Sequence, residues 1–72
     1  MRYYFHLEND ESIHIDHLGK DFEYVESAKV HAASVARKLA ATDRWQGWSL
    51  RVIDARNAEV TNIPIQDTLL HS

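Results

Sequence analysis

The 72-residue sequence contains no cysteine, only one proline and only two glycines. The absence of cysteine excludes disulfide bonds, thiol catalysis and cysteine-ligated zinc, and it is consistent with a reducing cytoplasm. So few prolines and glycines leave little room for linkers. No apolar run approaches the roughly 20 residues that span a bilayer, and the acidic opening stretch cannot serve as a signal peptide. We therefore expect one soluble, cytoplasmic domain, residues 1–72, with no membrane partner.

The protein has a net charge of −3, and its acidic and basic residues are unevenly distributed along the sequence. Residues 1–26 carry seven acidic and two basic side chains, whereas residues 27–56 carry six basic and two acidic ones. A basic region inside an acidic protein is typical of a solvated helix face, and it is also compatible with an anionic partner.

Two stretches near the N-terminus alternate between apolar and polar side chains, namely residues 2–8 and residues 12–16. Such alternation predicts two half-buried strands, and the polar residues between them are typical of a turn. Phe5 opposite Ile15, and Leu7 opposite Ile13, would keep the apolar side chains on one face. Gly19 can then adopt a positive φ and end the second strand.

The middle of the sequence has the period of a helix from Val25 to about Asp43. Its apolar positions form one stripe: Val25, Ala28, Ala32, Val35, Ala36 and Leu39. The small alanines would let the helix axis lie close to a sheet, and Gly47 marks the break that follows.

A second alternating pair follows at residues 48–54 and 59–66, with Asn57 as the left-handed residue of the turn between them. Pro64 lacks an N–H group, which indicates an edge strand. The order of elements predicts an α+β, two-layer ββαββ fold. We expect a four-stranded antiparallel sheet in the order 2-1-3-4, with the helix packed on one face.

Several motifs resemble a bacterial family of small proteins classed as a domain of unknown function. The motifs are RYYFHL at the start, then Asp16, Gly19 and Phe22, an alanine-rich helix, VIDARN, and IPIQDTL. The resemblance implies a short protein with no established activity or cofactor. A looser similarity, carried by ESAKVHAASVARKLA after the first hairpin, is to HicB-like antitoxin domains.

A metal site is the first candidate. In the expected register His6 lies opposite His14, with Asp16 two residues further along. Cross-strand Cβ atoms are about 4.5–5.5 Å apart, and two imidazoles with one carboxylate can bind a metal ion. The alternative is that all three are polar residues on the solvated face of the sheet, and we expect no cofactor.

A nucleic-acid site is the second candidate. Basic and aromatic residues that could neutralise phosphates and stack on bases are Lys29, Arg37, Lys38, Arg44, Trp45 and Trp48. The alternative is that the two tryptophans close the open end of the core.

The uncovered face of the expected sheet is the third candidate. Tyr4, Ile53 and Val60 give this face apolar side chains, and self-association would bury them. The alternative is a monomer with scattered exposed apolar residues.

Catalysis lacks a recognisable motif. The sequence has no glycine-rich phosphate loop and no HExxH spacing, and so small a two-layer fold offers little space for a pocket. We expect no enzymatic activity. The leading hypothesis is a small non-catalytic domain that acts through a protein partner, including a second copy of itself. The alternative is a nucleic-acid-binding or antitoxin-like regulator.

Overall fold

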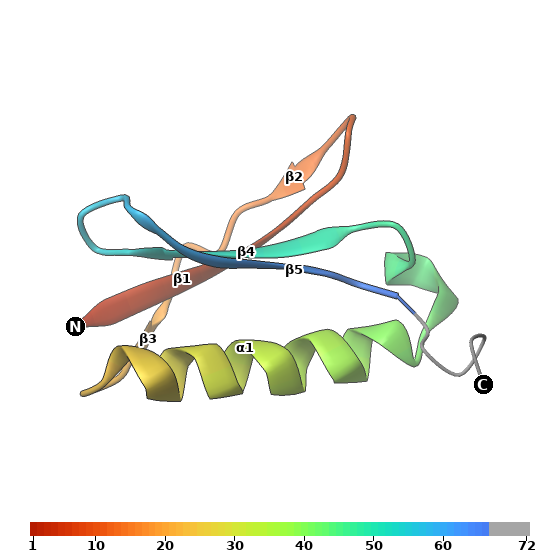
Figure 1. The fold of residues 1–72 in the computed structure, drawn as a ribbon. Coiled ribbons are helices and arrows are strands. Elements are labelled where there is room, and N and C mark those ends of the chain that lie inside the picture. The colour runs from red at the N-terminus through yellow and green to blue at the C-terminus, as the bar shows by residue number, and fades with distance from the viewer. Residues whose placement is uncertain (67–72) are drawn as a thin grey trace.

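The computed structural model describes residues 1–66 and has two layers, one helix and one antiparallel sheet (Figure 1). Its elements in chain order are β1 (Arg2–Glu8), β2 (Ile13–His14), β3 (Lys20–Asp21), α1 (Val25–Ala40), the 3₁₀ helix η1 (Asp43–Trp45), β4 (Ser49–Asp54) and β5 (Glu59–Pro64). The α+β class and the helix on one face of the sheet are confirmed. Within residues 1–66, no helix is long and apolar enough to cross a membrane.

The sheet has five strands, so the expected number of four is wrong. Its main path runs β2-β1-β4-β5, and β3 pairs with the start of β1 on the same side as β2. The extra strand is only two residues long and has no apolar alternation. It is held instead by Arg2, whose guanidinium forms an ion pair with Asp21 at 2.8 Å. Such a strand forms only because residues distant in the sequence contact it, and the apolar pattern of the strand itself does not predict those contacts.

The register of the first hairpin differs by one residue from the expected one. Leu7 pairs with His14, and Glu8 pairs with Ile13. The side chain of His14 therefore shares the face of Leu7, whereas Ile13 lies on the opposite face and is exposed. The tip of this hairpin lies far from α1, as Figure 1 shows, so burial of the two isoleucines does not decide the register.

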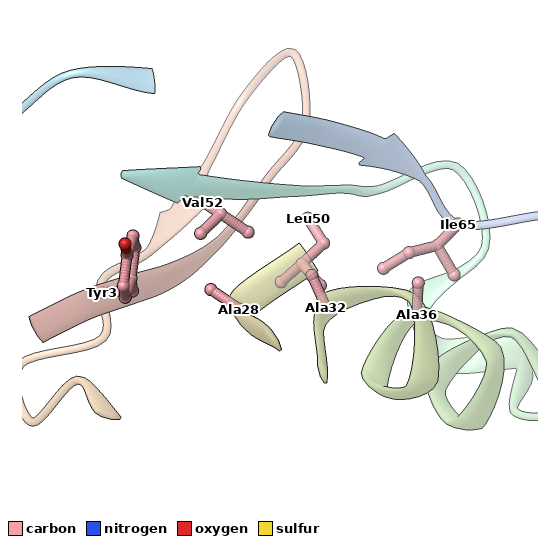
Figure 2. Packing of buried hydrophobic residues seen from close by; sticks show 7 residues of the cluster. All are labelled: Tyr3, Ala28, Ala32, Ala36, Leu50, Val52 and Ile65. Atoms are coloured by element: carbon pink, nitrogen blue, oxygen red, sulfur yellow. The ribbon is translucent and has the colours of Figure 1, made fainter. Parts of the chain in front are cut away.

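The core lies between α1 and the middle of the sheet. Its fully or almost fully buried residues are Tyr3, Ala28, Ala32, Ala36, Leu50, Val52 and Ile65 (Figure 2). Figure 2 shows the three alanines of α1 directed at the larger aliphatic side chains of β4 and of the segment after β5. The expected stripe is confirmed for Ala28, Ala32 and Ala36, and Val35 and Leu39 pack against the core. Val25 is exposed, so the stripe is wrong at the first residue of the helix.

The second hairpin is present as expected, and in it Leu50 lies opposite Ile63 and Val52 lies opposite Thr61. Asn57 has a φ of 67° at the turn, as expected. A bulge then shifts the register between Val52 and Ile53. It leaves Val60 as an extra residue that packs against the buried core.

The helix ends at Ala40, earlier than expected. The side-chain amide of Gln46 donates a hydrogen bond to the Ala40 carbonyl at 2.6 Å, and the Thr42 hydroxyl donates to the Leu39 carbonyl at 2.9 Å. These side chains satisfy carbonyl groups that the end of a helix leaves without partners. Gly47, with a φ of 86°, lies in the turn that leads into β4.

Candidate functional site

Asp16 organises the segment between β2 and β3. Its carboxylate accepts three backbone N–H hydrogen bonds, from Phe5 at 3.1 Å through one oxygen and from Leu18 and Gly19 at 3.1 Å each through the other. The first bond replaces a rung of the ladder between β1 and the returning chain, and the other two form an Asx turn. The expected strand of residues 12–16 is therefore interrupted at Asp16, and pairing resumes at β3.

The hydrogen bonds to Asp16 favour the ionised form of its carboxyl group. Partial burial acts to raise the pKa of its carboxyl group, but the N–H groups of Gly19, Phe5 and Leu18 act the other way, as does the charge of nearby His6. The three backbone hydrogen bonds are the main cause, and they lower the pKa below its ordinary value without requiring a charge on His6, whose Nδ1 accepts a hydrogen bond. The carboxylate thus has a structural role as an acceptor of backbone hydrogen bonds.

His6 also has a structural contact in this segment. The backbone N–H of Asp16 donates to its Nδ1 at 3.0 Å, the ring stacks against Tyr4, and only 9% of the residue is exposed. Nδ1 therefore acts as a hydrogen-bond acceptor in this contact.

The expected metal ligands are not brought together as a set. His6 and Asp16 meet through a backbone N–H group, whereas His14 faces the other side of the sheet, paired with Leu7. The cause is the one-residue difference in register. No group of three or more histidine, aspartate or glutamate side chains suited to a metal ion occurs within residues 1–66.

The aromatic residues of the nucleic-acid candidate form a packed cluster at the end of α1. The ring of Trp45 lies 5.1 Å from that of Trp48, and the ring of His14 lies 5.1 Å and 5.5 Å from the two of them. The guanidinium of Arg44 lies 4.9 Å from the Trp45 ring centroid. Both tryptophans are half-buried and pack against the core, as the structural alternative expects.

The basic residues of that candidate are spread along the helix. Lys29, Arg37 and Lys38 are exposed, and no ion pair to a described residue is formed by any of them. Lys29 and Lys38 are nine positions apart, which places them on opposite sides of the helix. Four cations and two rings therefore do not form one continuous surface.

The sheet face opposite α1, which we call the open face, carries Tyr4 next to Ile53 in adjacent strands. Its centre is charged, since Arg51 forms ion pairs with Glu8 at 3.9 Å and with Glu59 at 3.1 Å. Val60 does not belong to this face, because the bulge directs it to the core. The expected apolar surface is thus smaller than predicted, and dimerisation through Tyr4 and Ile53 stays a prediction.

The segment after Asp16 covers part of the open face. The Leu18 carbonyl accepts a hydrogen bond from Arg2 at 2.6 Å, and an added Cβ on Gly19 would lie 2.9 Å from the ring of Tyr4. Arg2 and Tyr4 both point to this face, so residues 16–19 lie against it near the edge of β1. The sheet is therefore not bare on that side.

Three exposed apolar side chains lie close together in the sequence, in β2 and in the segment between β2 and β3. Ile13, Ile15 and Leu18 are 48%, 46% and 79% exposed. The sequence interpretation assigned the two isoleucines to the core because they alternate with polar residues. Asp16 was the available signal against that assignment, because an aspartate followed three residues later by glycine is typical of a turn that interrupts a strand.

These features define the class of protein, a small α+β domain whose five-stranded sheet carries one helix and whose first hairpin exposes apolar side chains. The chain belongs to the family described as domain of unknown function DUF6894, whose model matches residues 2–66. The expected membership of a family of unknown function is confirmed at this level. The final residues of the IPIQDTL motif, 67–69, lie outside the described part of the chain. No curated protein and no solved structure matches the chain.

Proposed function

We propose that this protein is a small non-catalytic domain that acts by binding another protein. The observation that carries the proposal is the exposure of Ile13, Ile15 and Leu18 within six consecutive residues. A domain of this size has few large aliphatic side chains for its core, and exposing three of them together has a cost in stability. Clustered exposed apolar residues are typical of protein-binding surfaces, whereas single ones are ordinary.

The local backbone supports a preformed binding surface. The hairpin turn is held by the Asn9 side chain, whose oxygen accepts hydrogen bonds from the backbone of Glu11 and Ser12. At the other end the Leu18 carbonyl accepts a hydrogen bond from Arg2, and Asp16 between them anchors the chain to β1. Both ends of the exposed segment are therefore fixed, so a partner would lose little binding energy to ordering it.

Affinity capture with matched variants tests the proposal. Leu18→Ser removes the most exposed apolar side chain of the segment, and Val30→Ser removes one that is 70% exposed on α1. We expect the wild type and the Val30→Ser variant to retain the same protein after nuclease treatment. We expect Leu18→Ser to weaken the measured dissociation constant of the purified pair at least tenfold. Equal binding by all three proteins, or loss of the partner on nuclease treatment, would contradict the proposal.

A nucleic-acid-binding or antitoxin-like function is the second candidate, supported by the helix cations that lack ion-pair partners among residues 1–66. The structure supports it less, because Arg44 and His14 already contact the Trp45 ring that would stack on a base. Fluorescence titration with single-stranded polyuridylate tests it. Binding that weakens with salt and with Arg37→Gln would favour this function over the first.

A further inference from the structure

The two edges of the sheet differ in their capacity to accept another strand. At the β5 edge, Pro64 has no N–H group to donate. At the other edge, residues 12–15 precede the interruption at Asp16, and we call them the edge segment. An unpaired strand edge is a template for an added strand unless it is blocked. The edge segment is thus the one to examine.

The hydrogen bonds of the first hairpin show which backbone groups of the edge segment face outward. The N–H of Asn9 donates to the Ser12 carbonyl at 2.9 Å, and Phe5 bonds with Asp16. Along an antiparallel strand, successive residues direct their backbone N–H and C=O groups alternately toward and away from the neighbouring strand. Ser12 and His14 therefore direct these groups toward β1, and at Asp16 the side-chain carboxylate takes their place. The N–H and C=O groups of Ile13 therefore point away from β1, and those of Ile15 do so where the alternation continues past β2.

The side chains around these groups favour a basic occupant. Asp10 and Glu11 are exposed at the tip of the hairpin, and residues 9–19 contain no lysine or arginine. Asp16 adds a third carboxylate, although its oxygens are used by backbone N–H groups. Ile13 and Ile15 supply apolar anchors on one side of the added strand. Outward-facing backbone groups, apolar anchors and acidic surroundings together are complementary to an extended segment rich in lysine or arginine.

We propose that the edge segment binds a short, extended, basic segment of a partner protein as an additional strand of the sheet. The inference rests on the proposed function and specifies the partner's chemistry. Main-chain hydrogen bonds to Ile13 and Ile15 provide the pairing. Apolar residues at alternate positions of the partner contact their side chains, and basic residues lie near Asp10 and Glu11. The interruption at Asp16 limits the pairing to a few residues.

Blocked pentapeptides test the pairing directly. The probe alternates lysine and valine (KVKVK), and its controls are KPKPK, which keeps the charge but removes the backbone N–H groups of its second and fourth residues and disfavours a paired strand, and EVEVE, which reverses the charge. We expect KVKVK to bind at least tenfold more tightly than either control, and to shift the amide NMR signals of Ile13 and Ile15 most. Equal affinity for KPKPK would overturn the proposal, since attraction between charges would then explain the binding. Absence of detectable KVKVK binding would also overturn it.

Variants of the domain locate the site. Ile13→Ser combined with Ile15→Ser changes exposed side chains only, so the fold persists, which circular dichroism checks. We expect this variant to bind KVKVK at least tenfold more weakly and the Val30→Ser control to bind it as the wild type does. Asp10→Asn with Glu11→Gln should weaken binding severalfold and reduce its salt dependence. Unchanged binding in the Ile13→Ser, Ile15→Ser variant and in the Asp10→Asn, Glu11→Gln variant would overturn the proposal.

The two proposals can fail separately. A captured partner that Leu18→Ser releases, but that the Ile13→Ser, Ile15→Ser variant retains, would preserve protein binding as the function and exclude strand addition. Failure of capture by the wild type, together with absence of KVKVK binding, would reject both.

Discussion

One oxygen of the Asp16 carboxylate accepts the backbone N–H of Phe5 at a distance of 3.1 Å. The position corresponds to a rung of the antiparallel ladder that a backbone carbonyl would ordinarily supply. Because a side chain takes that place, the main chain is free to turn away toward Gly19 and return as β3. One contact between a loop residue and a strand residue thus explains why the edge of the sheet is divided.

Asp16→Asn should destabilise the domain, because it replaces one accepting oxygen by an NH₂ group. If the amide oxygen faces Leu18 and Gly19, the NH₂ group meets the N–H of Phe5 and leaves it without an acceptor. An unsatisfied, partly buried N–H costs about 1–3 kcal/mol. Urea denaturation measures the change. Asp10→Asn removes the same charge from an exposed side chain and should change the free energy of unfolding by less than about 0.5 kcal/mol.

The contribution of the ionised Asp16 carboxyl should depend on pH in a defined direction. Its pKa in the folded protein is lowered below the ordinary value of about 3.9. A group with a depressed folded pKa stabilises the fold above its unfolded pKa, and that stabilisation is lost as pH falls through the folded value. The stability difference between wild type and Asp16→Asn should therefore be constant from pH 5 to 7 and shrink below about pH 4. A difference that grows on acidification would contradict this role.

Gly19 and Gly47 should differ in their tolerance of alanine, although both have positive φ. At Gly19 an added Cβ would lie 2.8 Å from Arg2 Cγ and 2.9 Å from the Tyr3 carbonyl oxygen, whereas at Gly47 nothing lies within 4 Å. Gly47→Ala should cost only the left-handed backbone strain, about 1–2 kcal/mol. Gly19→Ala should cost about 1–3 kcal/mol more from overpacking. Thermal denaturation of the two variants compares them, and equal losses would exclude the close approach as the cause.

His31 should make stability sensitive to mild acid. Its ring lies 5.1 Å from Phe5 and 5.4 Å from Phe22, and its pKa is lowered by burial first, then by Lys20 and Lys38. Because the folded state favours the neutral ring, this histidine binds protons more readily when unfolded. The sign is therefore a loss of stability as pH falls below about 6.5, the ordinary histidine value.

His31→Gln removes this titration and provides the measurement. At pH 7.5 the variant should be less stable by about 0.5–1.5 kcal/mol, because aromatic contacts are lost. At pH 5 the difference from wild type should be smaller. His17→Gln, at an exposed position, should follow the wild type at both pH values. An unchanged difference for His31→Gln at the two pH values would show that this ring does not contribute to the acid sensitivity.

The alanine stripe of α1 should not tolerate larger side chains. Ala32 is fully buried against the sheet, whereas its neighbour Ala33 is exposed. Ala32→Leu should destabilise the domain by about 1–3 kcal/mol or more, because the helix must move away from the sheet. Ala33→Leu should have an effect within about 0.5 kcal/mol. Chemical denaturation of the two variants measures these changes in the free energy of unfolding. Similar losses for both variants would show that Ala32 does not lie on the face of α1 that packs against the sheet.

Local sequence was sufficient for several features. The apolar period from Val25 to about Asp43 located the helix and its buried alanines, although the helix ends at Ala40. The period is informative because only one face of a helix can meet a single sheet. The two strands of the second hairpin followed from alternation, and the positive φ of Asn57 followed from its short amide side chain. Each of these depends on residues close together in the chain.

Only the tertiary structure decided the edge of the sheet and the surface beside it. The bond from Phe5 to Asp16 and the ion pair between Arg2 and Asp21 join residues 11 and 19 positions apart. The first lies where the expected strand is interrupted, and the second lies beside β3, where the chain pairs with β1 again. Alternation predicts burial only where a second layer covers the strand, and α1 does not reach the tip of this hairpin. The candidate surface therefore arises from long-range polar contacts, which apolar periodicity does not encode.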